Sequence, residues 1–292
     1  MKKQLLLSIF VIGYIILMVT NLIASGLLGS VIGKFSVIVA AVLAYVTIVF
    51  VIAQMVRRYD IVDIAWGGGF IVAALTSFLL HPGGIQFGWN VQTIATTLVL
   101  IWGLRLGYYI LRRVMRSTGE DPRYLDMRKQ CKGSVAINAY LRIFITQGLL
   151  AIIISISFIH INLSTESTVS WLTYIGVLIW LVGFIFEAVG DAQLKKHLGN
   201  LENRGTIMTQ GLWRFTRHPN YFGEATQWWG IFIICLGVPY GIDGIIGPVV
   251  ITYLLLFVSG VPLTEKRFEG RPGWDDYRRQ TSMFVPMLPK KV

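Results

Sequence analysis

The stretch FSVIVAAVLAYVTIVFVIAQMV, residues 35–56, decides the fold class, because it carries no charged side chain and is followed directly by Arg57 and Arg58. A helix needs about 20 mostly apolar residues to cross a bilayer, so this stretch predicts a membrane-spanning helix that ends at a basic loop. The whole chain has the same character. It is 54% hydrophobic and 14% charged, whereas soluble domains carry roughly 25% charged residues. We therefore predict that most of this protein lies in a lipid bilayer.

Seven further apolar segments extend this prediction along the chain. The eight together span about residues 4–24, 35–56, 61–80, 91–111, 140–161, 170–190, 223–239 and 244–262. The first follows Lys2 and Lys3 and resembles a signal peptide, but it is longer than a signal core and lacks a small-residue cleavage site. We interpret it as a retained helix. The sequence thus predicts an all-α, polytopic bundle of about eight transmembrane helices.

The basic residues predict how this bundle is oriented. Lys and Arg gather in the second, fourth and sixth connections and in the C-terminal tail, while the third, fifth and seventh connections have none. Cytoplasmic loops carry the excess of basic residues, so both chain ends are predicted to be cytoplasmic. The net charge of +11 therefore reflects membrane topology, and no nucleic-acid partner is expected.

The two cysteines predict neither a disulfide nor a metal centre. Cys131 lies in a basic loop and Cys235 in an apolar segment, so they are not expected to meet. Neither has a companion at a metal-ligand spacing.

Charged side chains inside apolar segments are candidate functional groups, because each costs at least about 2.5–3.5 kcal/mol in the hydrocarbon region. Asp63, Arg105 and Glu187 are such residues. Asp63 could also serve only to anchor a helix start, and Arg105 is expected to need Asp63 or Glu187 as an internal partner. Glu187 shares a helix face with Asp191 and Lys195, which an ordinary charged helix end would explain equally well.

Three consecutive glycines follow Asp63 closely. Gly67, Gly68 and Gly69 are expected to allow close helix packing. They do not form a nucleotide-binding loop, because no strand precedes them.

The most informative polar segment is GLWRFTRHPNYFGE, residues 211–224, just before the seventh apolar segment. Pro219 and Glu224 suit the first turn of a helix. That role does not explain the other polar side chains, which are Arg214, Arg217, His218, Asn220 and Tyr221. Beside a helix N-terminus, these groups would form a cradle for a polyanion. A basic loop lying on the membrane surface is the alternative.

The RHPNYFGE element, with Trp228 and Trp229 after it, resembles the C-terminal domain of the steroid 5-alpha-reductase-like membrane family, closest to its uncharacterised bacterial branch. The similarity extends to VDIAWG (62–67), WGLRL (102–106), GEDPRY (119–124), Glu187 with Asp191, WDDY (274–277) and FVP (284–286). It covers about residues 35–288. Residues 1–34 would then be an additional N-terminal transmembrane helix, before a seven-helix reductase-like domain at 35–292.

The resemblance implies NADPH-dependent reduction of a carbon–carbon double bond conjugated to a carbonyl in a lipid-like, apolar small molecule. It places the cofactor between helices near the cytoplasmic face and implies a bacterial inner membrane location. Carried over by motif, the cofactor-binding residues would be Arg105, Arg116, Asp191, Lys195, Arg217, His218, Asn220, Tyr221, Glu224 and Tyr277.

The resemblance also implies two catalytic positions. Asp63 falls where the family has a carboxylic acid, and a neutral acid could donate a hydrogen bond to the substrate carbonyl. Trp102 falls where the steroid enzymes have tyrosine, and its indole N–H can donate a hydrogen bond but cannot release a proton. These departures leave the reduction plausible and argue against a steroid as the substrate.

Two other functions stay open. The Arg-His-Pro element alone is shared with isoprenylcysteine carboxyl methyltransferases, which would make S-adenosylmethionine the cofactor, although Glu265 offers one acid where those enzymes have a pair. A non-enzymatic, lipid-binding protein is the third possibility. A reductase should have a dinucleotide pocket lined by Arg105, Arg217 and Asn220, next to an apolar chamber that contains Asp63 and Trp102.

Overall fold

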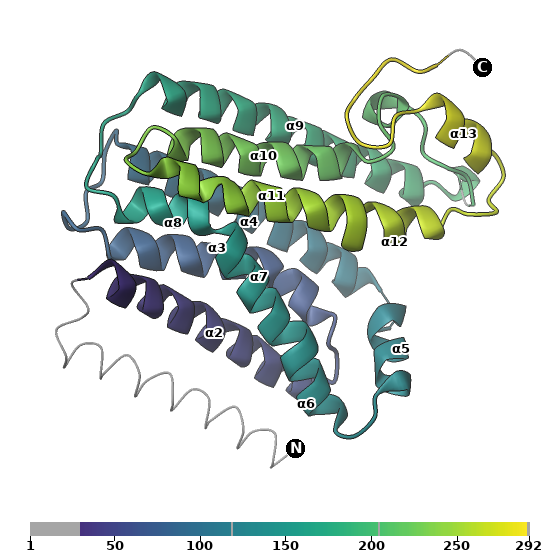
Figure 1. Cartoon of the computed structure of the whole chain (residues 1–292). Helices are drawn as coiled ribbons and strands as arrows, with labels where there is room; N and C mark the ends of the chain where they lie inside the picture. The colour runs from purple at the N-terminus through teal and green to yellow at the C-terminus, as the bar shows by residue number, and fades with distance from the viewer. Residues whose placement is uncertain (1–29, 118, 204, 291–292) are drawn as a thin grey trace. The chain divides into compact units, whose positions relative to one another are not determined.

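The computed structural model describes residues 30–117, 119–203 and 205–290 (Figure 1). Within these ranges the chain forms helices and no β-strand, apart from one isolated bridge between Thr216 and Ser282. The helix expected at residues 4–24 lies outside the described residues. The predicted all-α class is confirmed.

The chain divides into two compact units, the first ending at Thr168 and the second covering Val169–Val292. The first contains α2 (Val31–Val56), α3 (Ile61–Leu79), α4 (Val91–Arg116), α5 (Pro122–Gln130), α6 (Val135–Ala139), the π-helix η2 (Tyr140–Ile145), α7 (Thr146–Ile154) and α8 (Ile156–Leu163). The second contains α9 (Trp171–Gly199), η3 (Leu201–Asn203), η4 (Gly211–Arg214), α10 (Pro219–Cys235), η5 (Gly241–Ile245), α11 (Ile246–Tyr253), the π-helix η6 (Leu254–Val258), α12 (Val261–Lys266) and α13 (Trp274–Gln280).

Six helical stretches in the described part of the chain are long and apolar enough to cross a membrane. They are Val31–Val56, Ile61–Leu79, Val91–Arg116, Val135–Ile154, Trp171–Gly199 and Gly241–Lys266. The helix α10 has 17 residues and is not one of these six, although this length is at the lower limit of about 17–25 residues for a span.

The predicted helix ends were less accurate than the predicted helices. The segment expected at 170–190 continues to Gly199, because its polar last turns remain helical after the apolar run ends. The segment expected at 140–161 begins at Val135, where Ser134 caps α6. A π-helical turn then replaces the regular α-helix between α6 and α7.

The three consecutive glycines of α3 each meet a different helix, which confirms the prediction of close packing. A Cβ atom on Gly67 would lie 2.6 Å from the carbonyl oxygen of Gly103 in α4. One on Gly68 would collide with the hydroxyl of Tyr45 in α2, and one on Gly69 would touch Ala151 in α7 at 3.5 Å. Glycine at these positions lets α3 lie at the centre of the first unit.

In the second unit, α9 and α10 lie side by side and antiparallel (Figure 1). Glycines spaced seven residues apart on each helix face one another. A Cβ atom on Gly176 would lie 2.5 Å from the oxygen of Gly230, and one on Gly183 would lie 2.6 Å from the oxygen of Gly223. This close approach brings the polar side chains of α9 directly against α10.

Candidate functional site

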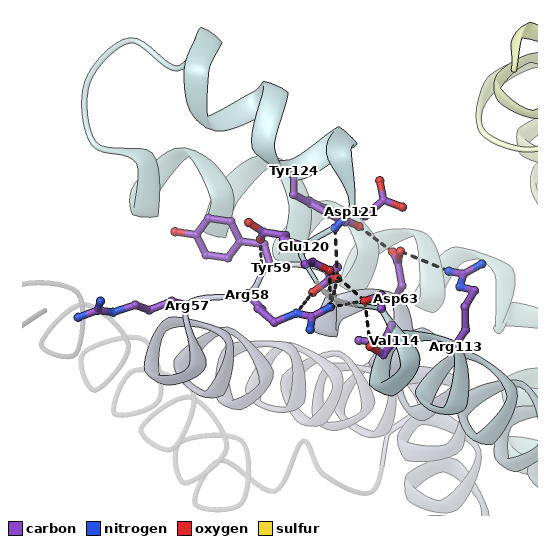
Figure 2. Close-up of polar contacts among 12 residues, drawn as sticks. Arg57, Arg58, Tyr59, Asp63, Arg113, Val114, Glu120, Asp121 and Tyr124 are labelled. Atoms are coloured by element: carbon purple, nitrogen blue, oxygen red, sulfur yellow. Dashed lines mark hydrogen bonds and ion pairs between the residues drawn. The ribbon is translucent and has the colours of Figure 1, made fainter.

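The polar cluster of the first unit forms where the GEDPRY segment and α5 fold onto the turn between α2 and α3 (Figure 2). Asp60 is only 3% exposed and accepts two hydrogen bonds from the Arg58 guanidinium, at 3.0 and 2.7 Å. The backbone N–H of Asp121 also donates to Asp60, at 3.3 Å. Arg58 reaches further, to the Ser117 hydroxyl and the Gly119 carbonyl. This network fixes the start of α5 to the start of α3.

Asp63 lies at the centre of the same cluster, and both of its carboxyl oxygens act as acceptors (Figure 2). The Tyr124 hydroxyl donates to Oδ1 at 2.6 Å, and the Arg123 guanidinium donates to Oδ2 at 2.7 Å. Arg113 lies 4.0 Å from the same Oδ2. Burial raises the pKa of Tyr124, and the neighbouring Asp63 raises it further, so this phenol stays protonated and donates. The arrangement suits a carboxylate, whereas the sequence-based hypothesis needs a protonated Asp63 that donates.

A second acid in the motif completes the cluster. Glu120 accepts from the backbone N–H of Tyr59 at 2.5 Å and from Arg128 at 2.9 Å. The Arg128 guanidinium lies 4.3 Å from the centre of the Tyr59 ring. No role of these side chains was predicted from the sequence. The motif carries three charged residues, Glu120, Asp121 and Arg123, but α3 and α4 separate it from Asp60 and Asp63 in the chain.

The other predicted residues of the first unit lie on α4. Trp102 is buried, with its ring edge-on to Phe70 at 5.1 Å. The Arg105 guanidinium lies 5.7 Å from the centre of the Tyr109 ring. Arg116 is the exposed last residue of α4. Asp63, one of the two partners expected for Arg105 beside Glu187, forms ion pairs with Arg123 and Arg113.

A small apolar crevice lies among α2, α3 and α7. Its walls include Val62, Trp66 and Gln147. Neither Asp63 nor Trp102 lines it. This crevice is therefore not the apolar chamber that the sequence predicts.

In the second unit, the RHPNYFGE element forms the start of α10. The guanidinium of its first residue, Arg217, donates hydrogen bonds to several protein groups. Arg217 is buried and donates to Glu265 Oε1 through Nε at 2.8 Å. Its Nη1 donates to the carbonyls of Arg278 and Thr281, at 3.0 and 2.6 Å. Arg217 thus holds the C-terminal segment against α10. Glu265, which sequence reasoning considered only as a methyltransferase acid, is a central member of this group.

His218 shares the same carboxylate. Its Nε2 lies 3.2 Å from Glu265 Oε1, so we assign the proton to Nε2 and leave Nδ1 as an acceptor. The imidazole stacks on Tyr221 at 5.3 Å, with the rings 10° from parallel. The Tyr221 hydroxyl hydrogen-bonds to the Thr264 hydroxyl at 2.9 Å. Burial lowers the pKa of His218 below its ordinary value, against the opposing effect of Glu265.

Asn220 joins this group to α9. Its Nδ2 donates to Asp191 Oδ1 at 3.2 Å, while no described residue donates to its buried Oδ1. Lys195 is exposed one turn beyond Asp191, and Glu224 is half-buried in the first turns of α10. The Tyr277 hydroxyl donates to the Trp213 carbonyl at 2.6 Å, so it supports η4 in this structure.

The structure therefore brings five predicted residues together in the second unit. They are Asp191, Arg217, His218, Asn220 and Tyr221. Across the described ranges, no group of three or more His, Cys, Asp or Glu side chains is arranged to hold a metal ion. Hydrogen-bonding groups and a stacked ring pair beside a helix N-terminus can bind an anionic or polyhydroxylated ligand.

The apolar helices and the polar groups at their ends define a polytopic α-helical membrane protein. A family model described as "Protein of unknown function (DUF1295)" matches residues 49–281, and the chain belongs to this family. No curated protein matches the chain.

We expect the stability of the second unit to depend on pH through His218. The unfolded chain binds a proton near pH 6.5, whereas the folded chain binds it only at a lower pH. The free energy of unfolding should therefore fall as the pH is lowered from about 6.5 toward the pKa of the folded state. Thermal unfolding between pH 7.5 and 5.5 would measure this. The His218→Gln variant should show a smaller decrease over that interval, and equal slopes in the two proteins would contradict the assignment.

Proposed function

We propose that this chain is an NADPH-dependent membrane reductase that acts on a carbon–carbon double bond conjugated to a carbonyl in an apolar, lipid-like substrate. Family membership supports the proposal, because DUF1295 is associated with steroid 5-alpha-reductase-like proteins. We further propose a bacterial inner membrane location, with both chain ends and the polar clusters on the cytoplasmic side, as the distribution of basic residues indicates.

The observation that carries the proposal is the buried Oδ1 of Asn220, to which no described residue donates. A buried acceptor without a donor costs about 1–3 kcal/mol, so a ligand that supplies an N–H or O–H group would bind favourably there. A dinucleotide has such donors on its riboses and its carboxamide. The residues around Asn220 therefore fit this cofactor chemically.

The proposal gives the neighbouring residues separate roles. Asp191 orients the Asn220 amide, and His218 offers Nδ1 as an acceptor beside it. Arg217 and Glu265 hold the start of α10 against the C-terminal segment, because Arg217 donates hydrogen bonds to Glu265 and to the carbonyls of Arg278 and Thr281. The first-turn N–H groups of α10 suit the phosphates. When bound, NADPH would supply the hydride.

The first unit supports a more limited proposal. Asp63 and Trp102 remain the proposed groups for the substrate carbonyl, and Arg105 and Arg116 remain proposed cofactor contacts. Asp63 accepts hydrogen bonds from Tyr124 and Arg123. To donate to a carbonyl, Asp63 would have to gain a proton and release at least one of these partners.

The test is cofactor binding to the detergent-purified, full-length protein. We expect NADPH to raise the thermal unfolding temperature and the Asn220→Ala variant to bind NADPH roughly tenfold more weakly, since the hydrogen bond to the oriented Asn220 amide is lost. The matched control is Asn200→Ala, because Asn200 is exposed at the end of α9 and bonds only locally, to Glu202. Equal binding by wild type and Asn220→Ala would contradict the assignment, as would the absence of any NADPH effect.

One contact favours a second candidate, an S-adenosylmethionine-dependent methyltransferase. Glu265, at the end of the last membrane-spanning stretch, meets both members of the Arg-His pair, at 2.8 Å and 3.2 Å. Stabilisation by S-adenosylmethionine in place of NADPH, in the same thermal assay, would select this candidate. Stabilisation by neither would favour the lipid-binding alternative.

A further inference from the structure

One face of α4 forms an apolar stripe that is largely exposed. Its side chains follow one another at spacings of three and four residues, which places them on the same side of an α-helix. They are Ile101, Leu104, Tyr108, Leu111 and Met115. At 1.5 Å per residue the stripe is about 21 Å long, which exceeds the roughly 15 Å of hydrocarbon in one leaflet of a bilayer. Such a stripe can lie along the acyl chain of a lipid.

At the C-terminal end of this stripe, α4 is strongly basic. Arg112, Arg113 and Arg116 lie in its last turns and are exposed, and the helix contains no acidic residue. Arg113 is directed toward Asp63, with 4.0 Å between the two side chains (Figure 2). In the part of the chain that the structure describes, no carboxylate forms an ion pair with Arg112 or Arg116. Two cations beside the stripe therefore lack a protein anion.

Tyr108 joins the stripe to its basic end. The Arg112 Nη1 donates to the Tyr108 hydroxyl at 2.7 Å, and the guanidinium lies 5.6 Å from the centre of the Tyr108 ring. Tyrosine is enriched at the boundary between membrane and water, where its ring is in apolar surroundings and its hydroxyl in polar ones. The contact orients the guanidinium but uses only one of its N–H groups. Its remaining donors can bind a phosphate, whose geometry the planar fork of arginine fits.

We propose that the C-terminal end of α4 binds an anionic glycerophospholipid. One acyl chain lies along the apolar stripe, and the headgroup phosphate accepts hydrogen bonds from Arg112. A lipid fits better than a free phosphate, because Tyr108 connects the guanidinium directly to the stripe. An anionic headgroup fits better than a zwitterionic one, because this end of α4 carries three arginines and no acid. The inference goes beyond the proposed reductase function and does not depend on it.

The experiment compares two lipids that differ in headgroup charge. Phosphatidylglycerol and phosphatidylcholine with the same acyl chains are titrated into the detergent-purified, full-length protein, and native mass spectrometry measures how tightly the first lipid binds. We expect the wild-type protein to prefer phosphatidylglycerol by roughly tenfold. In the Arg112→Gln variant this preference should fall to roughly twofold, because one basic side chain beside an anionic lipid contributes about a factor of five.

Two more variants separate a defined site from general surface charge. Tyr108→Phe keeps the ring on the stripe but removes the hydroxyl that orients Arg112, so the preference should fall to an intermediate value. Lys132→Gln is the matched control, because it removes one positive charge from an exposed side chain in the connection between α5 and α6. It should retain the preference of the wild type. Arg116 stays unchanged throughout, since it is also a proposed cofactor contact.

Three results would overturn the inference. The first is equal binding of the two lipids by the wild type. The second is an equal loss of preference in Arg112→Gln and Lys132→Gln, which would mean that diffuse surface charge attracts the lipid. The third is a protein dimer that binds neither lipid, which would mean that a second copy of the chain covers the stripe. No cofactor is present in the measurement, so none of these results bears on the reductase proposal.

Discussion

Replacing Gly223 with alanine is expected to destabilise the protein by about 3 kcal/mol, at the upper end of the usual cost of overpacking. The new Cβ atom would lie 2.5 Å from the Gly183 carbonyl oxygen and 2.9 Å from Glu187 Cα. These are backbone atoms of α9, so no flexible side chain can move aside, and the two helices must separate. Thermal unfolding in detergent should show a midpoint lowered by roughly 6–12 °C.

Gly199→Ala is the matched control for Gly223→Ala. Gly199 is the last residue of α9, and a Cβ atom there would have no neighbour within 4 Å. Alanine is favoured over glycine in helices by about 1 kcal/mol, so this variant should be as stable as the wild type or slightly more stable. If both variants unfolded at the same temperature, the close contact between α9 and α10 would be wrong.

Asp60→Ala should detach α5 from the start of α3 and cost about 3 kcal/mol. Removing one partner of a buried ion pair costs about 3–5 kcal/mol, and we take the lower value because the Arg58 side chain is 28% exposed. The substitution removes both bonds from Arg58 and the bond from Asp121 N–H. Limited trypsin digestion measures the effect, since the α4–α6 connection contains several Arg and Lys residues.

The control for this substitution is Asp126→Ala, on α5 itself. Asp126 pairs with Lys129 at 3.7 Å, but both side chains are more than half exposed. Such surface pairs contribute at most about 1 kcal/mol, so cleavage of the connection should stay at the wild-type rate. Equal cleavage of the two variants would mean that the Asp60 network does not hold α5.

The membrane helices were predictable from the sequence because their signal is local. An uncharged run such as residues 35–56 needs no partner to reveal its preference for lipid. The same local signal does not reveal where α9 ends. Glu187, Asp191 and Lys195 end the apolar run, but the helix continues through them to Gly199, supported by contacts with α10 and η4.

The candidate site was predictable only in part. The RHPNYFGE element marked His218, Asn220 and Tyr221 as neighbours, since they share one turn of helix. Glu265 and the role of GEDPRY were not visible, because their contacts join residues about 47 and 61 positions apart in the chain. The sequence alone does not show which acidic side chain pairs with which basic one, because the path of the folded backbone determines these pairs.

The arrangement around Arg217 has a consequence for biosynthesis. The carbonyl groups that hold its guanidinium belong to Arg278 and Thr281, 61 and 64 positions further along the chain. The ribosome therefore completes α10 before it makes these two residues. Until they are available, Arg217 lacks two of its acceptors, so the surface that presents Asn220 cannot take its final form while α10 is being made.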